Sequence, residues 1–147
     1  MKVVAVCISE KKGTRKHTVD SIELKIDHGI VGDAHAGNWH RQVSFLDQSS
    51  FDKMKIAYPE LHPGDFAENI LTEGIELFTL PIGTRLRVGE TELEVTQIGK
   101  ECHKGCEIRN IVGDCVMPRE GIFGIVTKEG TIYPDDEIEI LKDEAND

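Results

Sequence analysis

Apolar and polar residues alternate along much of this chain with a period of two, the spacing of half-buried β-strands. The first segment, residues 2–9, is instead a nearly continuous apolar run rich in Val, which is typical of a buried strand. Six further segments have strand length and are bounded by turn-forming residues: 21–26, 41–46, 84–89, 92–99, 121–130 and 137–141. The pattern therefore predicts a mostly β protein.

One segment has the spacing of a helix. Asp and Ser residues from Asp47 onward can cap exposed N–H groups, and apolar residues recur from Phe51 to Ile56 before Pro59 ends the pattern. The following "GDFAENIL", residues 64–71, allows either one more helical turn or a short strand. We therefore expect one or two short helices.

The number and spacing of the strands indicate a mostly antiparallel barrel or sandwich. A chain of 147 residues can bury a core as one domain, which we place at residues 1–141. Residues 142–147 form an acidic C-terminal tail, which we expect to be solvated.

Charge and hydropathy narrow the functional classes. A net charge of −10 argues against nucleic acid as a partner, because phosphate binding requires concentrated Lys and Arg. The chain shows neither an apolar run of membrane-spanning length nor a basic-then-apolar opening. We therefore expect a cytoplasmic protein without a membrane partner, in which disulfides are disfavoured.

The cysteines present a choice between a metal and a reactive thiol. Cys7 lies within the first apolar run and is predicted to be in the core, whereas Cys102, Cys106 and Cys115 share one glycine-containing segment. Their spacing does not match the paired knuckles of a zinc ribbon, and adjacent Cys102 and His103 would not easily reach the same ion. Basic neighbours favour a reactive thiolate, but nearby acids offset them. Both interpretations stay open on residues alone.

Several segments in a fixed order resemble a known family. They are "GIVGDAHAG", "RQVSFL", "GDFAENILTEGIEL" and "LPIGTRLRVGETELEVTQIGKEC", which together extend from Gly29 to Cys102. This set is similar to the MOSC domain, the C-terminal domain of molybdenum cofactor sulfurases that also occurs alone in bacteria. The residue before the cysteine departs from familiar members, which have proline or arginine where this chain has Glu101.

The resemblance implies a twisted, largely antiparallel β-barrel that binds the molybdenum-pterin cofactor. It also implies that Cys102 is the reactive residue, either carrying sulfur as a persulfide or ligating molybdenum. Carried over to this chain, the cofactor-binding residues are Lys16, His35, Arg41, Asn69 and His103.

The resemblance further implies partners. The pyridoxal-phosphate desulfurase domain of full-length sulfurases is not in these 147 residues, so pyridoxal phosphate is not expected here. Sulfur transfer would need an external donor, a cysteine desulfurase, and an acceptor, either a molybdoenzyme or a cofactor-synthesis protein. The resemblance allows sulfur-transferase activity without requiring it. The alternative is a non-enzymatic binding module with a structural metal held by Cys102, Cys106 and Cys115.

Overall fold

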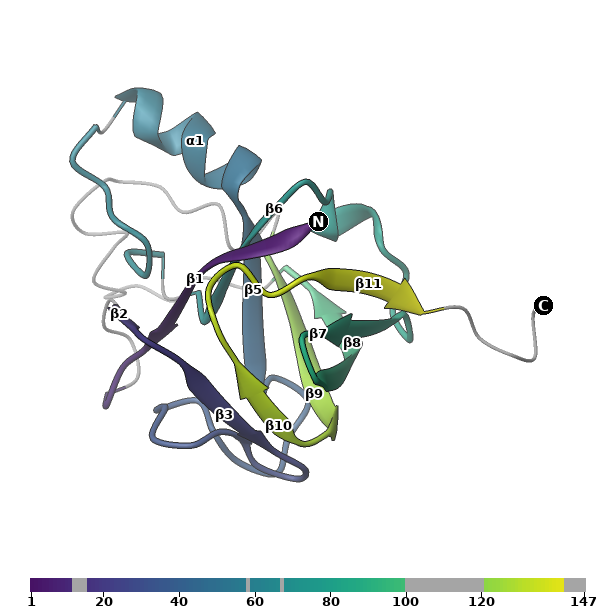
Figure 1. Ribbon diagram of the computed structural model, residues 1–147. Helices are drawn as coiled ribbons and strands as arrows, with labels where there is room; N and C mark the ends of the chain where they lie inside the picture. Colours follow the sequence, from purple (N-terminus) through teal and green to yellow (C-terminus); the bar gives the residue numbers. More distant parts are fainter. Residues whose placement is uncertain (12–15, 58, 67, 100–120, 142–147) are drawn as a thin grey trace.

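The computed structural model describes residues 1–11, 16–57, 59–66, 68–99 and 121–141. Within these residues the chain forms strands, one α-helix and one short 3-10 helix (Figure 1). The elements are β1 (Lys2–Ile8), β2 (His17–Val19), β3 (Ile22–Lys25), β4 (Gly29–Ile30), β5 (Val43–Asp47), α1 (Gln48–Ala57), β6 (Ile70–Glu73), η1 (Leu77–Thr79), β7 (Arg85–Val88), β8 (Thr91–Ile98), β9 (Ile122–Lys128), β10 (Gly130–Ile132) and β11 (Ile138–Leu141). The mostly β prediction is confirmed.

The strands form two sheets. The larger has eight strands in the order β11-β7-β8-β9-β5-β6-β1-β2, and the smaller has three in the order β10-β3-β4. The described strand pairs are antiparallel, with one exception. β5 and β6 run parallel, because the chain crosses from one to the other through α1. Among the described residues, no helix is long and apolar enough to span a membrane.

The helix begins as the sequence predicts. The Asp47 carboxylate accepts hydrogen bonds from the N–H of Ser49 at 3.2 Å and from its hydroxyl at 2.8 Å, so Asp47 is the N-cap of α1. The ambiguous segment 64–71 resolves into a turn followed by the start of β6 at Ile70.

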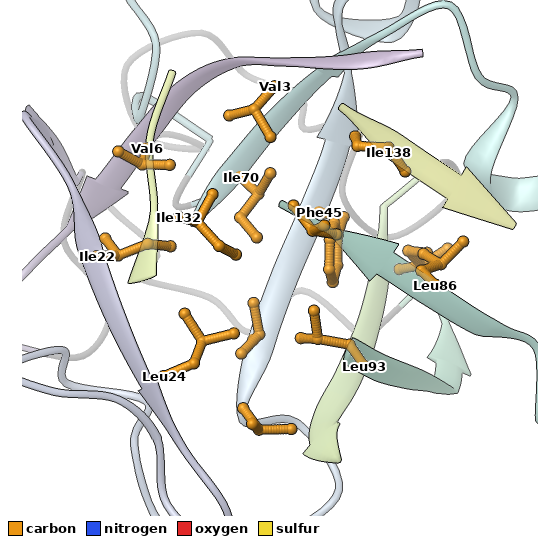
Figure 2. Packing of buried hydrophobic residues seen from close by; sticks show 14 of the residues in the cluster. Val3, Val6, Ile22, Leu24, Phe45, Ile70, Leu86, Leu93, Ile132 and Ile138 are labelled. Atoms are coloured by element: carbon orange, nitrogen blue, oxygen red, sulfur yellow. The ribbon is translucent and has the colours of Figure 1, made fainter. Parts of the chain in front are cut away.

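Two apolar clusters lie on opposite faces of the larger sheet. The first is enclosed with the smaller sheet and includes Phe45, Ile70 and Leu24 (Figure 2). The second contains Leu46 and Phe51 and lies under α1. Adjacent residues of β5 thus point to opposite clusters, as the two-residue period requires.

The closed barrel that the sequence analysis predicts is not supported by the described residues. The larger sheet ends at β11 and β2, and between its two ends there is one isolated bridge, Lys2 with Glu137. Val3 adds two backbone hydrogen bonds, from its N–H to Asp136 and from Asp135 to its carbonyl. The physical reason is that β2 pairs with β1 over residues 6–8, leaving only the start of β1 to meet the segment before β11. The tail predicted at residues 142–147 lies outside the described residues.

Candidate functional site

A buried lysine stands at the centre of the candidate site. The Lys16 ammonium donates to Asp33 Oδ1 at 2.7 Å, to His35 Nδ1 at 3.0 Å and to Ser9 Oγ at 3.2 Å. An ammonium group has three protons, so these acceptors can satisfy it completely. The side chains of Lys16 and Asp33 are both 0% exposed. The structure therefore brings together Lys16 and His35 of the predicted set, with Lys16 behind rather than at the surface.

Asp33 organises this cluster through the backbone. Its Oδ1 also accepts the N–H of Ser9 at 3.1 Å, and its Oδ2 accepts the N–H of His35 at 3.0 Å. The N–H of Ala34 donates to the carbonyl of Ser9 at 2.7 Å. These hydrogen bonds fix the loop after β4 to the end of β1. The buried Asp33 carboxylate is compensated both by the Lys16 ammonium and by backbone N–H groups.

These contacts assign the tautomer of His35. Because an ammonium only donates, His35 Nδ1 must be the acceptor in the 3.0 Å contact, and its proton then lies on Nε2. An ion pair from a protonated Nδ1 to Asp33 Oδ2 would span 3.8 Å, too long for a hydrogen bond. The shorter contact, to Lys16, therefore indicates that the His35 ring is neutral. The His35 side chain is 20% exposed, so it reaches the surface that Lys16 does not.

Trp39 joins His35 to a second cation. Its indole N–H donates to the His35 carbonyl at 2.7 Å, and the Arg41 guanidinium carbon lies 4.6 Å from its ring centroid. The same guanidinium lies 5.7 Å from the Phe123 ring. Both distances suit cation–π attraction, which holds a cation without neutralising it. Arg41 therefore keeps its positive charge in a fixed place between two aromatic rings.

Arg41 also has a polar atom that the described residues leave unsatisfied. Its Nε is buried and has no hydrogen-bond partner among them. A guanidinium presents several donors in one plane and suits a phosphate or carboxylate. Together with His35, Arg41 forms a donor set that fits the phosphate of a pterin cofactor, within a chain whose net charge is −10.

A pocket of about 270 Å³ lies beside Trp39 and His40. Its remaining lining combines four polar residues with two apolar ones: Asp27, Asn38, Gln42, Thr96, Ile125 and Val126. The carboxylate and amide groups are the kind that bind the edge of a nitrogen heterocycle.

The structure places Asn69 away from any surface. It is 0% exposed, and its Oδ1 accepts the N–H of Ser44 at 3.0 Å while its Nδ2 donates to the Cys7 carbonyl at 3.0 Å. The Asn69 amide thus connects β5 with β1 at the start of β6. This position gives Asn69 a structural task, and its predicted contact with a cofactor stays a prediction.

Beneath Lys16, a turn is built around a second buried acid. The Glu68 carboxylate is 0% exposed and accepts the N–H groups of Gly64 at 3.0 Å and Phe66 at 3.2 Å. Burial raises the pKa of Glu68 to about 7, with these hydrogen bonds opposing the shift. Burial also raises the pKa of the Cys7 thiol well above its usual range, and the Glu68 charge adds to this effect. Cys7 is buried, as predicted for a core residue.

The two described residues that flank the cysteine segment, Gly99 and Gly121, lie together. The N–H of Gly99 donates to the Gly121 carbonyl at 2.7 Å, and the Gln97 amide donates to the Gly99 carbonyl at 2.7 Å. Gln97 in turn accepts from His40 Nε2 at 2.9 Å. Four residues predicted for the thiol or metal site lie outside the described residues: Cys102, His103, Cys106 and Cys115. Among the residues that are described, no cluster of His, Cys, Asp and Glu could hold a metal ion.

Three residues of this site do not appear in the sequence-based set: Asp33, Trp39 and Glu68. Asp33 lies two positions before His35, so its place in "GDAH" is the available signal. Trp39 is the only tryptophan of the chain and lies in a polar loop, which is itself unusual. Glu68 gives no signal, because an acid next to Asn69 in a turn reads as a surface residue.

Comparison with known proteins identifies the family. The sequence model of the MOSC domain matches residues 32–139. A search of curated proteins finds no match. Among solved structures, the chain is similar to the YuaD protein from Bacillus subtilis, with a TM-score of 0.78, 21% identity, and coverage of 95% of this chain and 94% of that one.

Two further structures are similar over most of this chain. YiiM from Geobacillus stearothermophilus has a TM-score of 0.73 and 16% identity, covering 96% of this chain and 75% of that one. YiiM from Escherichia coli has a TM-score of 0.68 and 20% identity, covering 97% and 71%. These likenesses concern the fold, whereas the matched domain, which is associated with molybdenum cofactor binding, covers more than half of the sequence. The chain belongs to the MOSC domain family.

Proposed function

We propose that this protein binds the molybdenum-pterin cofactor at the site formed by His35 and Arg41, with Lys16 as a buried positive charge behind them. The observation that carries the proposal is the Arg41 guanidinium held between Trp39 and Phe123, with a buried Nε that finds no acceptor among the described residues. A phosphate oxygen supplies that acceptor.

The roles of the residues follow from their chemistry. Arg41 binds the phosphate through its planar donors, and His35 donates from Nε2. Lys16 keeps His35 in this tautomer through its 3.0 Å contact and adds positive charge to the site. The pocket beside Trp39, with its polar groups Asp27, Asn38 and Gln42, takes the pterin edge. When bound, the cofactor supplies a redox-active metal held by sulfur ligands.

Cofactor content tests this binding. The protein is purified from cells that make the cofactor, and molybdenum and released pterin are quantified per chain. Arg41→Ala should lose most of both, because the guanidinium is the main phosphate donor. Arg87→Ala is the matched control, since Arg87 is an exposed cation that pairs with Glu139 at 3.1 Å on another part of the sheet. Equal content in the two variants would contradict the proposal.

The finer function is a sulfur-carrier role for Cys102 in cofactor maturation or delivery. Its support is the sequence position of Cys102, three residues after Gly99. Gly99 follows Gln97, which contacts His40 next to Arg41. The segment that contains Cys102 therefore starts close to His40, the sequence neighbour of Arg41 in the proposed binding site.

The sulfur step is an exchange without net oxidation. The Cys102 thiolate attacks the terminal sulfur of a persulfide on an external cysteine desulfurase, a new S–S bond forms at Cys102, and the donor cysteine leaves as a thiolate. A molybdoenzyme or a cofactor-synthesis protein is the proposed acceptor. A soluble cytoplasmic location is part of the same proposal.

Intact-mass measurement tests the carrier role. After incubation with a cysteine desulfurase and cysteine, the protein should gain the mass of one sulfur atom, which reductant removes. Cys102→Ser should gain none, whereas Cys7→Ser should behave like the unchanged protein because Cys7 is buried. Sulfur loading that persists in Cys102→Ser would contradict the assignment.

A further inference from the structure

The turn of residues 62–66 is held from inside by one carboxylate, that of Glu68. Each oxygen of Glu68 accepts a backbone N–H, Oε2 from Gly64 at 3.0 Å and Oε1 from Phe66 at 3.2 Å. The Glu68 side chain has no exposed surface, so water cannot replace either bond. The shape of the turn therefore depends on Glu68.

This turn touches the backbone of Lys16. The Gly64 carbonyl accepts the N–H of Lys16 at 2.8 Å. A Cβ added to Gly64 would lie 2.3 Å from the Lys16 carbonyl oxygen, so the two backbones are in direct contact. The position of Gly64 consequently fixes where the Lys16 side chain starts, and the Lys16 ammonium in turn orients His35.

We propose that Glu68 is a positioning residue of the anion-binding site formed by His35 and Arg41. It acts through Gly64 on Lys16 and hence on the orientation of His35. The proposal rests on the proposed function in that it takes this site to bind an anion. In this proposal Glu68 does not contact the anion, but it determines the positions of Lys16 and His35. It also makes the affinity of the site sensitive to pH near neutrality.

The pH sensitivity follows from the state of the carboxylate. Burial raises the pKa of Glu68 to about 7, so the group changes charge in the neutral range. A carboxylate has two full acceptor oxygens, whereas the protonated acid turns one of them into a hydroxyl and weakens one of the two N–H bonds. Because the pKa is raised, burial outweighs these bonds, so the closed turn favours the protonated acid and opens more easily as the pH rises through 7.

Other titratable groups face the same region. Asp65 lies in the turn and acts on Glu68, and the Cys7 thiol of β1 is influenced by Glu68, Lys16, Asp65 and Asp33. His35 lies in the site itself and is retained in every variant compared. Comparison with Glu68→Gln at each pH removes these shared contributions.

The substitution Glu68→Gln separates two mechanisms. If Glu68 positions Lys16, Glu68→Gln weakens anion binding, because an amide cannot accept both N–H groups with its two end atoms. If Glu68 acted only as a negative charge near the site, removing that charge would strengthen anion binding. The sign of the change in affinity therefore separates a positioning role from a simple field effect.

The experiment measures sulfate binding by calorimetry about one pH unit below and above 7. Sulfate stands for the phosphate group because it keeps its double charge across this range. Glu68→Gln should bind sulfate roughly fivefold more weakly than the unchanged protein at both pH values. Asp65→Asn is the matched control in the same turn, because the Asp65 carboxylate accepts only the N–H of His62, at 2.8 Å, among the described contacts. Sulfate affinity of Glu68→Gln that equals or exceeds that of the unchanged protein would overturn the proposal.

Amide hydrogen exchange separates this proposal from the proposed function. The protection factor of the Lys16 amide, which is bonded to Gly64, should fall in Glu68→Gln and should fall in the unchanged protein as the pH rises above 7. If the unchanged protein does not bind sulfate at all, the anion site fails, but this exchange result still decides the positioning role. A protection factor that is the same at both pH values would overturn it, even if Glu68→Gln did not fold.

Discussion

The Nζ atom of Lys16 lies 2.7 Å from Oδ1 of Asp33, and neither side chain is exposed. A buried pair of this kind is compensated only while both partners are present, because each charge has been removed from water. The pair connects the chain before β2 with the loop after β4, so it couples the stability of the fold to the geometry of the site.

Removing Asp33 should be more damaging than removing Lys16. Asp33→Asn leaves the Lys16 charge buried without its carboxylate, and we expect the free energy of unfolding to fall by about 3–5 kcal/mol. Lys16→Met should be less damaging, because the Asp33 carboxylate keeps two backbone N–H donors. Urea denaturation of both variants and of the double variant measures the coupling. Purely additive effects would contradict an ion pair that acts as a unit.

The contact between Gly64 and Lys16 can be tested with two glycines. Both Gly64 and Gly32 have positive φ angles, +94° and +85°, but an added Cβ meets nothing within 4 Å at Gly32. Gly32→Ala should therefore lower the free energy of unfolding by the backbone strain alone, about 1–2 kcal/mol. Gly64→Ala should lower it further, because the new methyl would overlap the Lys16 carbonyl. Equal losses in thermal or urea denaturation would mean that the turn does not press on Lys16.

The pKa of Glu68 makes a prediction about stability and pH. Burial raises the pKa of Glu68 in the folded protein to about 7, above the ordinary value of 4.5, so folding favours the protonated acid. Relative to Glu68→Gln, the stability contributed by Glu68 should be complete below about pH 4.5 and should be lost as the pH rises through 7. The full change is about 3 kcal/mol. Urea midpoints of the two proteins across this range check it, and a constant difference would show that the pKa is not raised.

The thiols should differ sharply in reactivity. Cys7 is buried and its pKa is raised, so iodoacetamide should not label it in the folded protein. Cys102 should be labelled, and labelling of Cys7 should appear only after denaturation. Peptide mapping by mass spectrometry gives the extent at each position. Rapid labelling of Cys7 under native conditions would contradict its place in the core.

The strands were predictable because their alternation is a local property. Residues 92–99 give β8 (Thr91–Ile98) to within one residue, and Asp47 marks the start of α1. The three-residue β2 and the two-residue β4 are too short to show a period. The prediction of a closed barrel was not supported, because closure depends on pairing between residues far apart in the sequence, and among the described residues only a few such hydrogen bonds form between β1 and the segment before β11.

Within the site, the sequence predicted only those residues whose side-chain type by itself indicates ligand binding. His35 and Arg41 stand out in polar segments, and the fold joins them through Trp39. The burial of Lys16 was hidden, because its partner Asp33 is 17 positions away and a basic cluster reads as solvated. Asn69 shows the converse, since a polar side chain in a motif can serve the fold.

Trp39 offers the most direct test of the central claim, that this site binds the molybdenum-pterin cofactor. It is the only tryptophan of the chain, it hydrogen-bonds His35 and it lies under Arg41, so its fluorescence reports on this site alone. Titration with purified cofactor should change the fluorescence until one equivalent is bound, in the unchanged protein and in Arg87→Ala but not in Arg41→Ala. No saturable change, or the same titration curve in both arginine variants, would contradict the account.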